Sequence, residues 1–145
     1  MIKNRIMVVG AVGSGKSTLV RALNKELGNA SKTQSVEYHA KAIDTPGEFM
    51  ENPFYYRAIF ATSLEAETLV FTQDATRGIS IFPPGFAAAF SKKTIGVITK
   101  IDDPKANVKR AEQFLVSLGL TGPVFSISSF LGTGLDELRK YLNWD

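Results

Sequence analysis

The sequence predicts a three-layer α/β fold, with a mainly parallel sheet of five to six strands lying between helices. Short runs rich in valine and isoleucine alternate along the chain with longer segments of helical periodicity. No linker, repeat or low-complexity segment interrupts this alternation, and 145 residues suit a single domain. Polar motifs follow directly after the strand-like runs, which is where parallel sheets place their ligands. We therefore expect one minimal domain with one ligand-binding edge.

The elements are expected in the following order. Strands are predicted at 5–10, once or twice within 35–44, and then at 68–72, 94–99 and 124–126. Helices are predicted from Lys16 to about Leu27, from about Phe54 to Ser63, from about Pro104 to Leu118, and from Leu135 to about Asn143. The run 94–99 is apolar enough to be buried on both faces of the sheet. Segment 72–94 is short for a full helical crossover, so a reduced third helix is expected there.

Composition excludes several classes of function. Seventeen basic and 14 acidic residues leave a net charge of +3, with no dense basic run, so no nucleic-acid partner is expected. The absence of cysteine excludes disulfides and thiolate metal sites and fits a reducing compartment. The one histidine, His39, is expected on the solvent face of a strand. The apolar runs are too short to cross a bilayer and no signal peptide is evident, so we expect a cytoplasmic protein without a membrane partner.

A glycine-rich loop provides the first motif. Residues 10–17 match the pattern G-x-x-x-x-G-K-S between the apolar run 6–9 and a helix, which is the context that a phosphate-binding loop needs. Its backbone amides and the helix N-terminus would bind phosphate, Lys16 would reach the outer phosphates, and Ser17 would place its hydroxyl on Mg²⁺. The alternative is an ordinary glycine turn. The candidate nucleotide-binding residues here are Gly10, Gly13, Ser14, Gly15, Lys16, Ser17 and Thr18.

Two further segments are expected at the outer phosphates. Asp44-Thr45-Pro46-Gly47 follows a strand, so Asp44 can hold the water shell of Mg²⁺ while the Gly47 amide approaches a γ-phosphate. Thr33 is the best candidate for a threonine that closes on Mg²⁺. A plain turn and an ordinary loop threonine are the alternatives. The expected metal ligands are therefore Ser17, Thr33 and Asp44, and the candidate catalytic residues are Lys16, Thr33, Gly47 and Glu48.

Two later segments are candidates for binding the base. Thr99-Lys100-Ile101-Asp102 follows the strand 94–99. A carboxylate at Asp102 accepts two hydrogen bonds from one edge of guanine that adenine cannot donate, and the stem of Lys100 can cover the face of the base. Ser128 and Ser129 follow the last strand, where the Ser129 amide could reach the guanine carbonyl. A simple start to the final helix is the alternative for this last segment.

The order of these motifs resembles that of the small GTP-binding proteins of the Ras-like and Era-like type. More narrowly, the whole chain resembles the EutP/PduV family of ethanolamine and propanediol utilisation. The segments that carry this resemblance are 32–37, 44–49, 53–56 and 84–86. The resemblance implies a P-loop fold, a site for Mg²⁺ with GTP or ATP, and an association with bacterial microcompartments, whose shell or enzyme proteins would be partners.

The chain also departs from the pattern of an efficient GTPase. Glu48 stands where a signalling GTPase usually has the glutamine that orients water, so hydrolysis is expected to be slow. Val12 leaves less space than glycine for an incoming arginine. Arg57 and Arg77 are candidate cations, although surface positions are the stronger expectation for both. The aromatic segment 49–56 follows Gly47, and core packing and a partner surface are equally open for it.

Three functions remain open from the sequence. The first is a GTP-preferring nucleotide-binding protein with slow hydrolysis, which rests on Thr99-Lys100-Ile101-Asp102 and on the threonine expected to close on Mg²⁺. The second is ATP-dependent phosphoryl transfer to acetate, which the family resemblance makes plausible; no evident pair of arginines would bind the acetate carboxylate. The third is a protein in which the nucleotide acts only as a stabilising ligand of the folded state.

Overall fold

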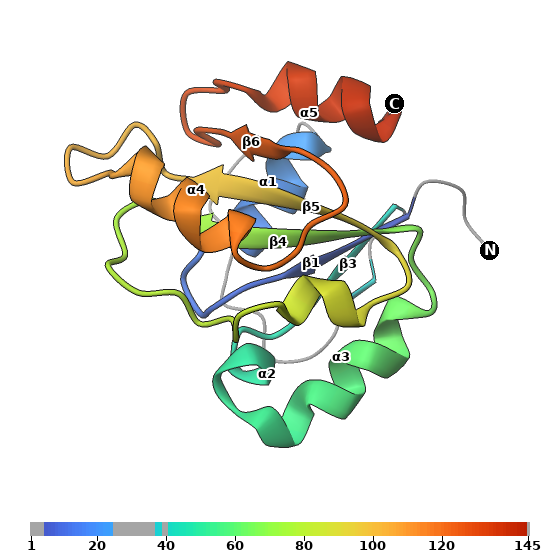
Figure 1. Ribbon diagram of the computed structural model, residues 1–145. Helices are drawn as coiled ribbons and strands as arrows, with labels where there is room; N and C mark the ends of the chain where they lie inside the picture. The colour runs from blue at the N-terminus through green and yellow to red at the C-terminus, as the bar shows by residue number, and fades with distance from the viewer. Residues whose placement is uncertain (1–4, 25–36, 39–40, 145) are drawn as a thin grey trace.

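The computed structural model describes residues 5–24, 37–38 and 41–144 (Figure 1). Within these residues, six strands form one sheet in the order β2-β3-β1-β4-β5-β6. The strands are β1 (Ile6–Val9), β2 (Glu37–Tyr38), β3 (Ala42–Asp44), β4 (Thr68–Asp74), β5 (Lys93–Thr99) and β6 (Val124–Ser126). β1, β3, β4, β5 and β6 run parallel, and β2 pairs antiparallel with β3 at the edge. The predicted fold class is confirmed.

Helices flank this sheet on both faces. They are α1 (Lys16–Leu23), α2 (Glu48–Glu51), α3 (Tyr56–Ser63), α4 (Val108–Val116) and α5 (Leu135–Leu142), with two short 3-10 helices, η1 (Pro53–Tyr55) and η2 (Phe86–Ala89). The helices predicted from the sequence are found, although α4 begins later than expected. The four-residue helix α2 was not predicted. The expected end of the first helix near Leu27, and His39, lie outside the described residues.

Alternating side chains of the strands form two apolar layers. On one face, Leu19 and Leu23 of α1 and Leu138 of α5 pack on Val8 and Val97 of the sheet. On the other face, residues of α2, α3, η2 and α4 pack on the sheet: Met50, Ile59, Phe86, Ala111 and Leu115 lie against Met7, Ile43, Leu69, Phe71 and Ile98. Figure 1 shows α1 and α5 on one side of the sheet and α2 and α3 on the other. Both faces of the central strands are therefore buried, as parallel sheets require.

The reduced third helix is confirmed. Between β4 and β5 the chain forms only η2, which begins after Gly85 with a φ of 74°. Aromatic rings fill the space that a longer helix would cover. Phe86 lies with its ring centroid 6.2 Å from that of Phe71 and 5.4 Å from that of Phe90. Because large rings bury more area per residue than aliphatic side chains, a short segment suffices to cover this part of the sheet.

The parallel strands bring the polar motifs together. The loops that follow β1, β3, β4, β5 and β6 all leave from the carboxyl edge of the sheet, because these strands share one direction. Val8 lies in register with Asp44, and Asp74 with Thr99. Motifs that are far apart in the sequence are thus neighbours at one edge, where ligands bind in open α/β sheets.

Candidate functional site

The loop of residues 10–17 joins β1 to α1 in a conformation that needs its glycines. Gly13 and Gly15 have φ values of 76° and 95°, and Gly15 is the N-cap of α1. A Cβ on Gly10 would lie 2.0 Å from Thr72 Oγ1, so only glycine fits there. The first turn of α1 contains no acidic residue that would neutralise the positive end of the helix. The loop and helix therefore present the arrangement that binds phosphate groups.

Side chains from neighbouring strands hold this loop in place. Thr72 Oγ1 at β4 donates to Val9 O at 3.1 Å and lies 2.9 Å from Ser14 Oγ. Thr99 Oγ1 at the end of β5 donates to Ser14 O at 2.6 Å. All these groups are buried, so each hydrogen bond also removes the cost of an unsatisfied polar atom. The Ser14 side chain thus helps to hold the loop against β4. Sequence reasoning missed Thr72, which has no local motif and acts on a loop 58 residues away.

Lys16 lies inside the loop with 6% of its surface exposed. Its Nζ donates to Ala11 O at 3.0 Å. Burial lowers the pKa of Lys16 below its usual value, an effect that the nearby carboxylates of Asp44 and Glu48 oppose. An anion in the loop would favour the charged form of this buried amine, and the position is the one predicted for a lysine that contacts the outer phosphates.

Ser17 and Asp44, two of the expected metal ligands, lie together beside Lys16. The Ser17 hydroxyl donates to Asp44 Oδ2, and Asp44 is 1% exposed at the end of β3. A hydroxyl and a carboxylate are the hard oxygen donors that Mg²⁺ prefers, so this pair fits a magnesium site completed by phosphate oxygens and water. Within the described residues, no group of three or more His, Cys, Asp or Glu residues could hold a metal by itself. Thr33, the third expected ligand, lies outside the described residues.

The segment after β3 closes directly on the phosphate loop. Thr45 Oγ1 donates to Val8 O at 2.7 Å, which fixes the start of the segment. Gly47 precedes α2, and a Cβ there would lie 2.2 Å from Val12 N. Glu48, half-buried on α2, lies close enough to Lys16 to raise its pKa. Gly47 is therefore required for the close approach of the two backbones.

Glu51 is a residue of the site that the sequence analysis missed. Its Oε2 accepts the N–H of Val12 at 3.2 Å, and its charge also raises the pKa of Lys16. The carboxylate thus accepts a hydrogen bond from a backbone amide of the phosphate loop. Glu51 follows Glu48 by three residues on α2, a spacing that places both carboxylates on one side of a helix. A prediction of this short helix from the sequence would therefore have indicated Glu51 as well as Glu48.

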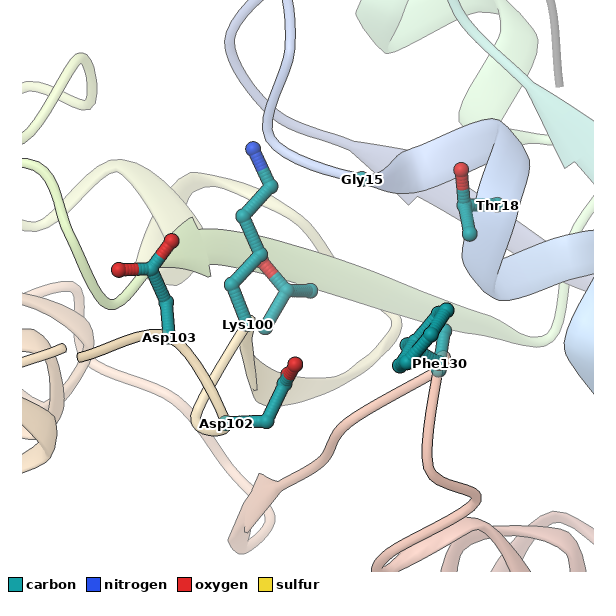
Figure 2. Close-up of a pocket in the computed structure, with 8 residues that line it drawn as sticks. Gly15, Thr18, Lys100, Asp102, Asp103 and Phe130 are labelled. Carbon is teal, nitrogen blue, oxygen red and sulfur yellow. The ribbon is translucent and has the colours of Figure 1, made fainter. Parts of the chain in front are cut away.

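A pocket opens beside the start of α1, between the loops that follow β5 and β6. Figure 2 shows this pocket, whose walls are formed by Gly15, Thr18, Thr99, Lys100, Asp102, Asp103, Ser129 and Phe130. Most of the residues predicted to bind a nucleotide base are therefore brought together, next to the phosphate loop. Ser128 is fully buried behind this wall, and its Oγ accepts the N–H of Leu131 at 3.0 Å.

Lys100 connects the pocket to the phosphate loop. It has a φ of 62°, and its Nζ donates to Gly13 O at 2.7 Å and to Asp74 Oδ2 at 2.9 Å. Although burial alone would raise the pKa of Asp74, hydrogen bonds from Thr76 and Lys100 lower it below its usual value. The carboxylate of Asp74 and the carbonyl of Gly13 thus orient Lys100. Asp74 was not predicted from the sequence, where its only signal is its position at the end of a strand.

The remaining candidates divide between surface and core. Arg57 and Arg77 are both exposed, as expected, and the charge of Arg77 contributes to the lowered pKa of Lys16. Of the aromatic residues after Gly47, Phe49 and Tyr56 pack against the core, whereas Phe54 is 82% exposed. Core packing is therefore found for Phe49 and Tyr56, and a partner surface at Phe54 stays a prediction. No helix in the described part of the chain is long and apolar enough to span a membrane.

A protein-family model and several known proteins are similar to this chain. The family model described as "Ethanolamine utilisation - propanediol utilisation", PduV-EutP, matches residues 3–144. A relative from Escherichia coli named "Probable acetate kinase EutP" is 37% identical over 140 residues, which cover 95% of this chain and 88% of the relative. "Propanediol utilization protein PduV" of Citrobacter freundii is 35% identical over 141 residues, covering 96% of this chain and 93% of the relative.

A solved structure shares the fold. The crystal structure of the bacterial selenocysteine-specific elongation factor EF-Sec superposes with a TM-score of 0.69 at 19% identity. The match covers 99% of this chain but only 28% of the elongation factor, so this chain corresponds to one part of that larger protein. At this identity the likeness concerns the fold alone.

Proposed function

The chain belongs to the PduV-EutP family of ethanolamine and propanediol utilisation proteins, as its resemblance predicted, and we propose that it is a GTP-preferring, Mg²⁺-dependent nucleotide-binding protein with slow hydrolysis. The observation that carries the proposal is the juxtaposition of two features. The buried Lys16 in a glycine-rich loop lies next to a pocket that contains Asp102 and Lys100. The loop with Lys16 suits a phosphate chain, and the pocket with Asp102 and Lys100 suits a purine base.

The phosphate chain would occupy the loop of residues 10–17. Its backbone amides and the N-terminus of α1 would donate hydrogen bonds to phosphate oxygens. Lys16 would exchange the carbonyl of Ala11 for a phosphate oxygen, which is a stronger, charge-assisted partner. Ser17 and Asp44 would hold Mg²⁺, which when bound neutralises charge on the outer phosphates.

Guanine preference would come from Asp102. Its carboxylate faces the pocket (Figure 2) and can accept hydrogen bonds from the two adjacent N–H groups on one edge of guanine. Adenine has no such pair of donors, so the exchange of guanine for adenine would leave a desolvated carboxylate unsatisfied. The amide of Ser129, on the facing loop, supplies a donor for the guanine carbonyl.

Slow hydrolysis follows from the side chains near the outer phosphates. Glu48 and Glu51 both lie close enough to Lys16 to affect its pKa. Two carboxylates at this position would repel a γ-phosphate, and Glu48 cannot orient the attacking water as an uncharged glutamine does. Hydrolysis of the bound nucleoside triphosphate is therefore expected to be slow, because neither of these carboxylates positions the attacking water efficiently.

The decisive experiment is calorimetric titration with GTP and ATP, with and without Mg²⁺. The wild type should prefer GTP, and Asp102→Asn should lose that preference. Asp103→Asn is the matched control, because it removes the same charge from the same pocket while Asp103 Oδ1 is already bonded to the Lys105 N–H. Equal affinity for both nucleotides in the wild type would contradict guanine selection, and no binding of either would refute the proposal.

Phosphoryl transfer to acetate is the second candidate, supported by the printed name of the 37% identical relative. In this reaction an acetate oxygen attacks the γ-phosphorus, the bond from that phosphorus to the bridging oxygen breaks, and acetyl phosphate and a nucleoside diphosphate form. Glu48 is compatible with it, because water is not the acceptor. Formation of acetyl phosphate that Lys16→Ala abolishes would favour this function. Binding without turnover of either kind would leave the nucleotide as a stabilising ligand.

A further inference from the structure

We infer that Glu51 biases the site towards a nucleoside diphosphate and against a triphosphate, because its carboxylate lies at the outer part of the phosphate loop, where a third phosphate would bind. This inference rests on the proposed function, because it requires a nucleotide in the loop of residues 10–17. Glu51 would respond to the number of phosphates in the ligand, whereas Asp102 would respond to the base. It is thus a specificity-determining residue outside the sequence motifs.

The contact between Glu51 and the loop is the first observation. Glu51 Oε2 accepts the N–H of Val12 at 3.2 Å, and the carbonyl of the preceding residue, Ala11, accepts Lys16 Nζ at 3.0 Å. The carboxylate and the end of the Lys16 side chain therefore meet the loop at adjacent residues. The lysine of such a loop reaches the outer phosphates, whereas the amides at the start of the helix bind the inner ones. The Glu51 carboxylate thus lies on the side of the third phosphate.

The charges around Lys16 are the second observation. Burial lowers the pKa of Lys16, whereas the carboxylates of Asp44, Glu48 and Glu51 raise it. This buried amine is therefore surrounded by anions of the protein itself before a ligand binds. Glu48 and Glu51 both belong to α2, so their charges act from the same side. A diphosphate would place its charge mainly at the start of α1, whereas a third phosphate would add negative charge directly beside these two carboxylates.

The helix that carries Glu51 is anchored to the core. Met50 is 2% exposed and belongs to the apolar cluster on this face of the sheet. The ring of Phe49 stacks on that of Tyr55, with the ring centroids 5.0 Å apart and an angle of 9° between the ring planes. A third phosphate could break the hydrogen bond to Val12 by rotating the Glu51 side chain, but the charge would stay on the same anchored helix. The repulsion is therefore not removed by a side-chain rotation alone.

The test measures the Kd of GTP and of GDP, with Mg²⁺ and at low salt, for the wild type and three variants. Glu51→Gln keeps an acceptor for the Val12 N–H but removes one negative charge, so the ratio of the Kd for GTP to the Kd for GDP should fall by about 2- to 5-fold. Glu51→Lys changes the charge by two units, so the same ratio should fall by about 4- to 25-fold.

Glu112→Gln is the matched control. It removes the same charge from an exposed position on α4, and the charge of Glu112 is not among those that affect Lys16. Its ratio of the two Kd values should equal that of the wild type. Melting curves without nucleotide check that all three variants fold as the wild type does.

The outcomes separate this inference from the proposed function. If Glu51→Gln changes the affinities for GTP and GDP by the same factor, or changes neither, selection against the third phosphate is refuted while the proposed function stands. An equal shift of the ratio in Glu112→Gln would also refute it, since the net charge of the protein and not the position of Glu51 would then set the ratio. A wild type that binds neither nucleotide refutes the proposed function itself.

Discussion

Replacing Asp74 by asparagine tests how the pocket is connected to the phosphate loop. Asp74 Oδ1 accepts the N–H of Thr76 at 2.8 Å and its hydroxyl at 2.6 Å, while Oδ2 accepts Lys100 Nζ at 2.9 Å. Asparagine can keep its oxygen toward Thr76. Its amide nitrogen then faces the ammonium of Lys100, where two donors meet. The substitution therefore removes one charge-assisted hydrogen bond and changes little else in shape.

The structure sets the size of the effect. The Asp74 side chain is 6% exposed but that of Lys100 is 44% exposed, so the freed ammonium can regain water. A hydrogen bond between charged groups contributes about 1.5–3 kcal/mol when buried, and screening at the exposed partner reduces this to roughly 1–2 kcal/mol. For a chain of this length we expect the melting temperature to fall by roughly 3–8 °C at pH 7.

Urea unfolding and thermal melting across a range of pH are the assays. The lowered pKa of Asp74 means that its contribution is present above its usual value of 3.8 and is lost as the pH falls through the lower pKa of the folded state. The difference between wild type and Asp74→Asn should therefore disappear in acid. Asp136→Asn is the control, because Asp136 also bonds to a cation, Arg139, at 2.9 Å but is 99% exposed. A difference that persists unchanged in acid, or equal stability at pH 7, would refute this reasoning.

Three further substitutions probe the phosphate loop. Because burial lowers the pKa of Lys16, the wild type should gain stability relative to Lys16→Met as the pH rises toward the usual lysine value of 10.5, measured by urea unfolding, and GTP should protect only the wild type. Glu51→Gln keeps an acceptor for the Val12 N–H but removes a negative charge, so the Kd for GTP should fall by about 2- to 5-fold at low salt, with the gain lost at high salt. Gly47→Ala would place a Cβ 2.2 Å from Val12 N and should cost about 1–3 kcal/mol in unfolding experiments, whereas Gly78→Ala, whose Cβ meets nothing closer than 3.7 Å, should be neutral.

The sequence was sufficient to predict the fold and the edge of the sheet at which the local motifs meet. Apolar runs located the strands closely, as with β5, which spans Lys93–Thr99 where 94–99 was expected, because buried parallel strands need continuous apolar residues. Motifs that follow such strands must meet at one edge, which is why Lys16, Asp44 and Lys100 were placed correctly relative to one another. The short span between β4 and β5 also predicted the reduced third helix, since a full crossover needs more residues.

The residues that sequence reasoning missed act across long distances or from a very short helix. Thr72 and Asp74 support loops that are remote in sequence, so only the register of β4 beside β1 and β5 places them. Glu51 lies on α2, whose four residues are too few to give a periodic pattern.

The hydrogen bonds that Thr72, Thr99 and Lys100 make to the phosphate loop have a consequence for the thermodynamics of association. A backbone whose dihedral angles are already restricted loses little conformational freedom when a ligand arrives. In the proposed nucleotide complex, the conformational entropy lost on binding would then come mainly from the nucleotide.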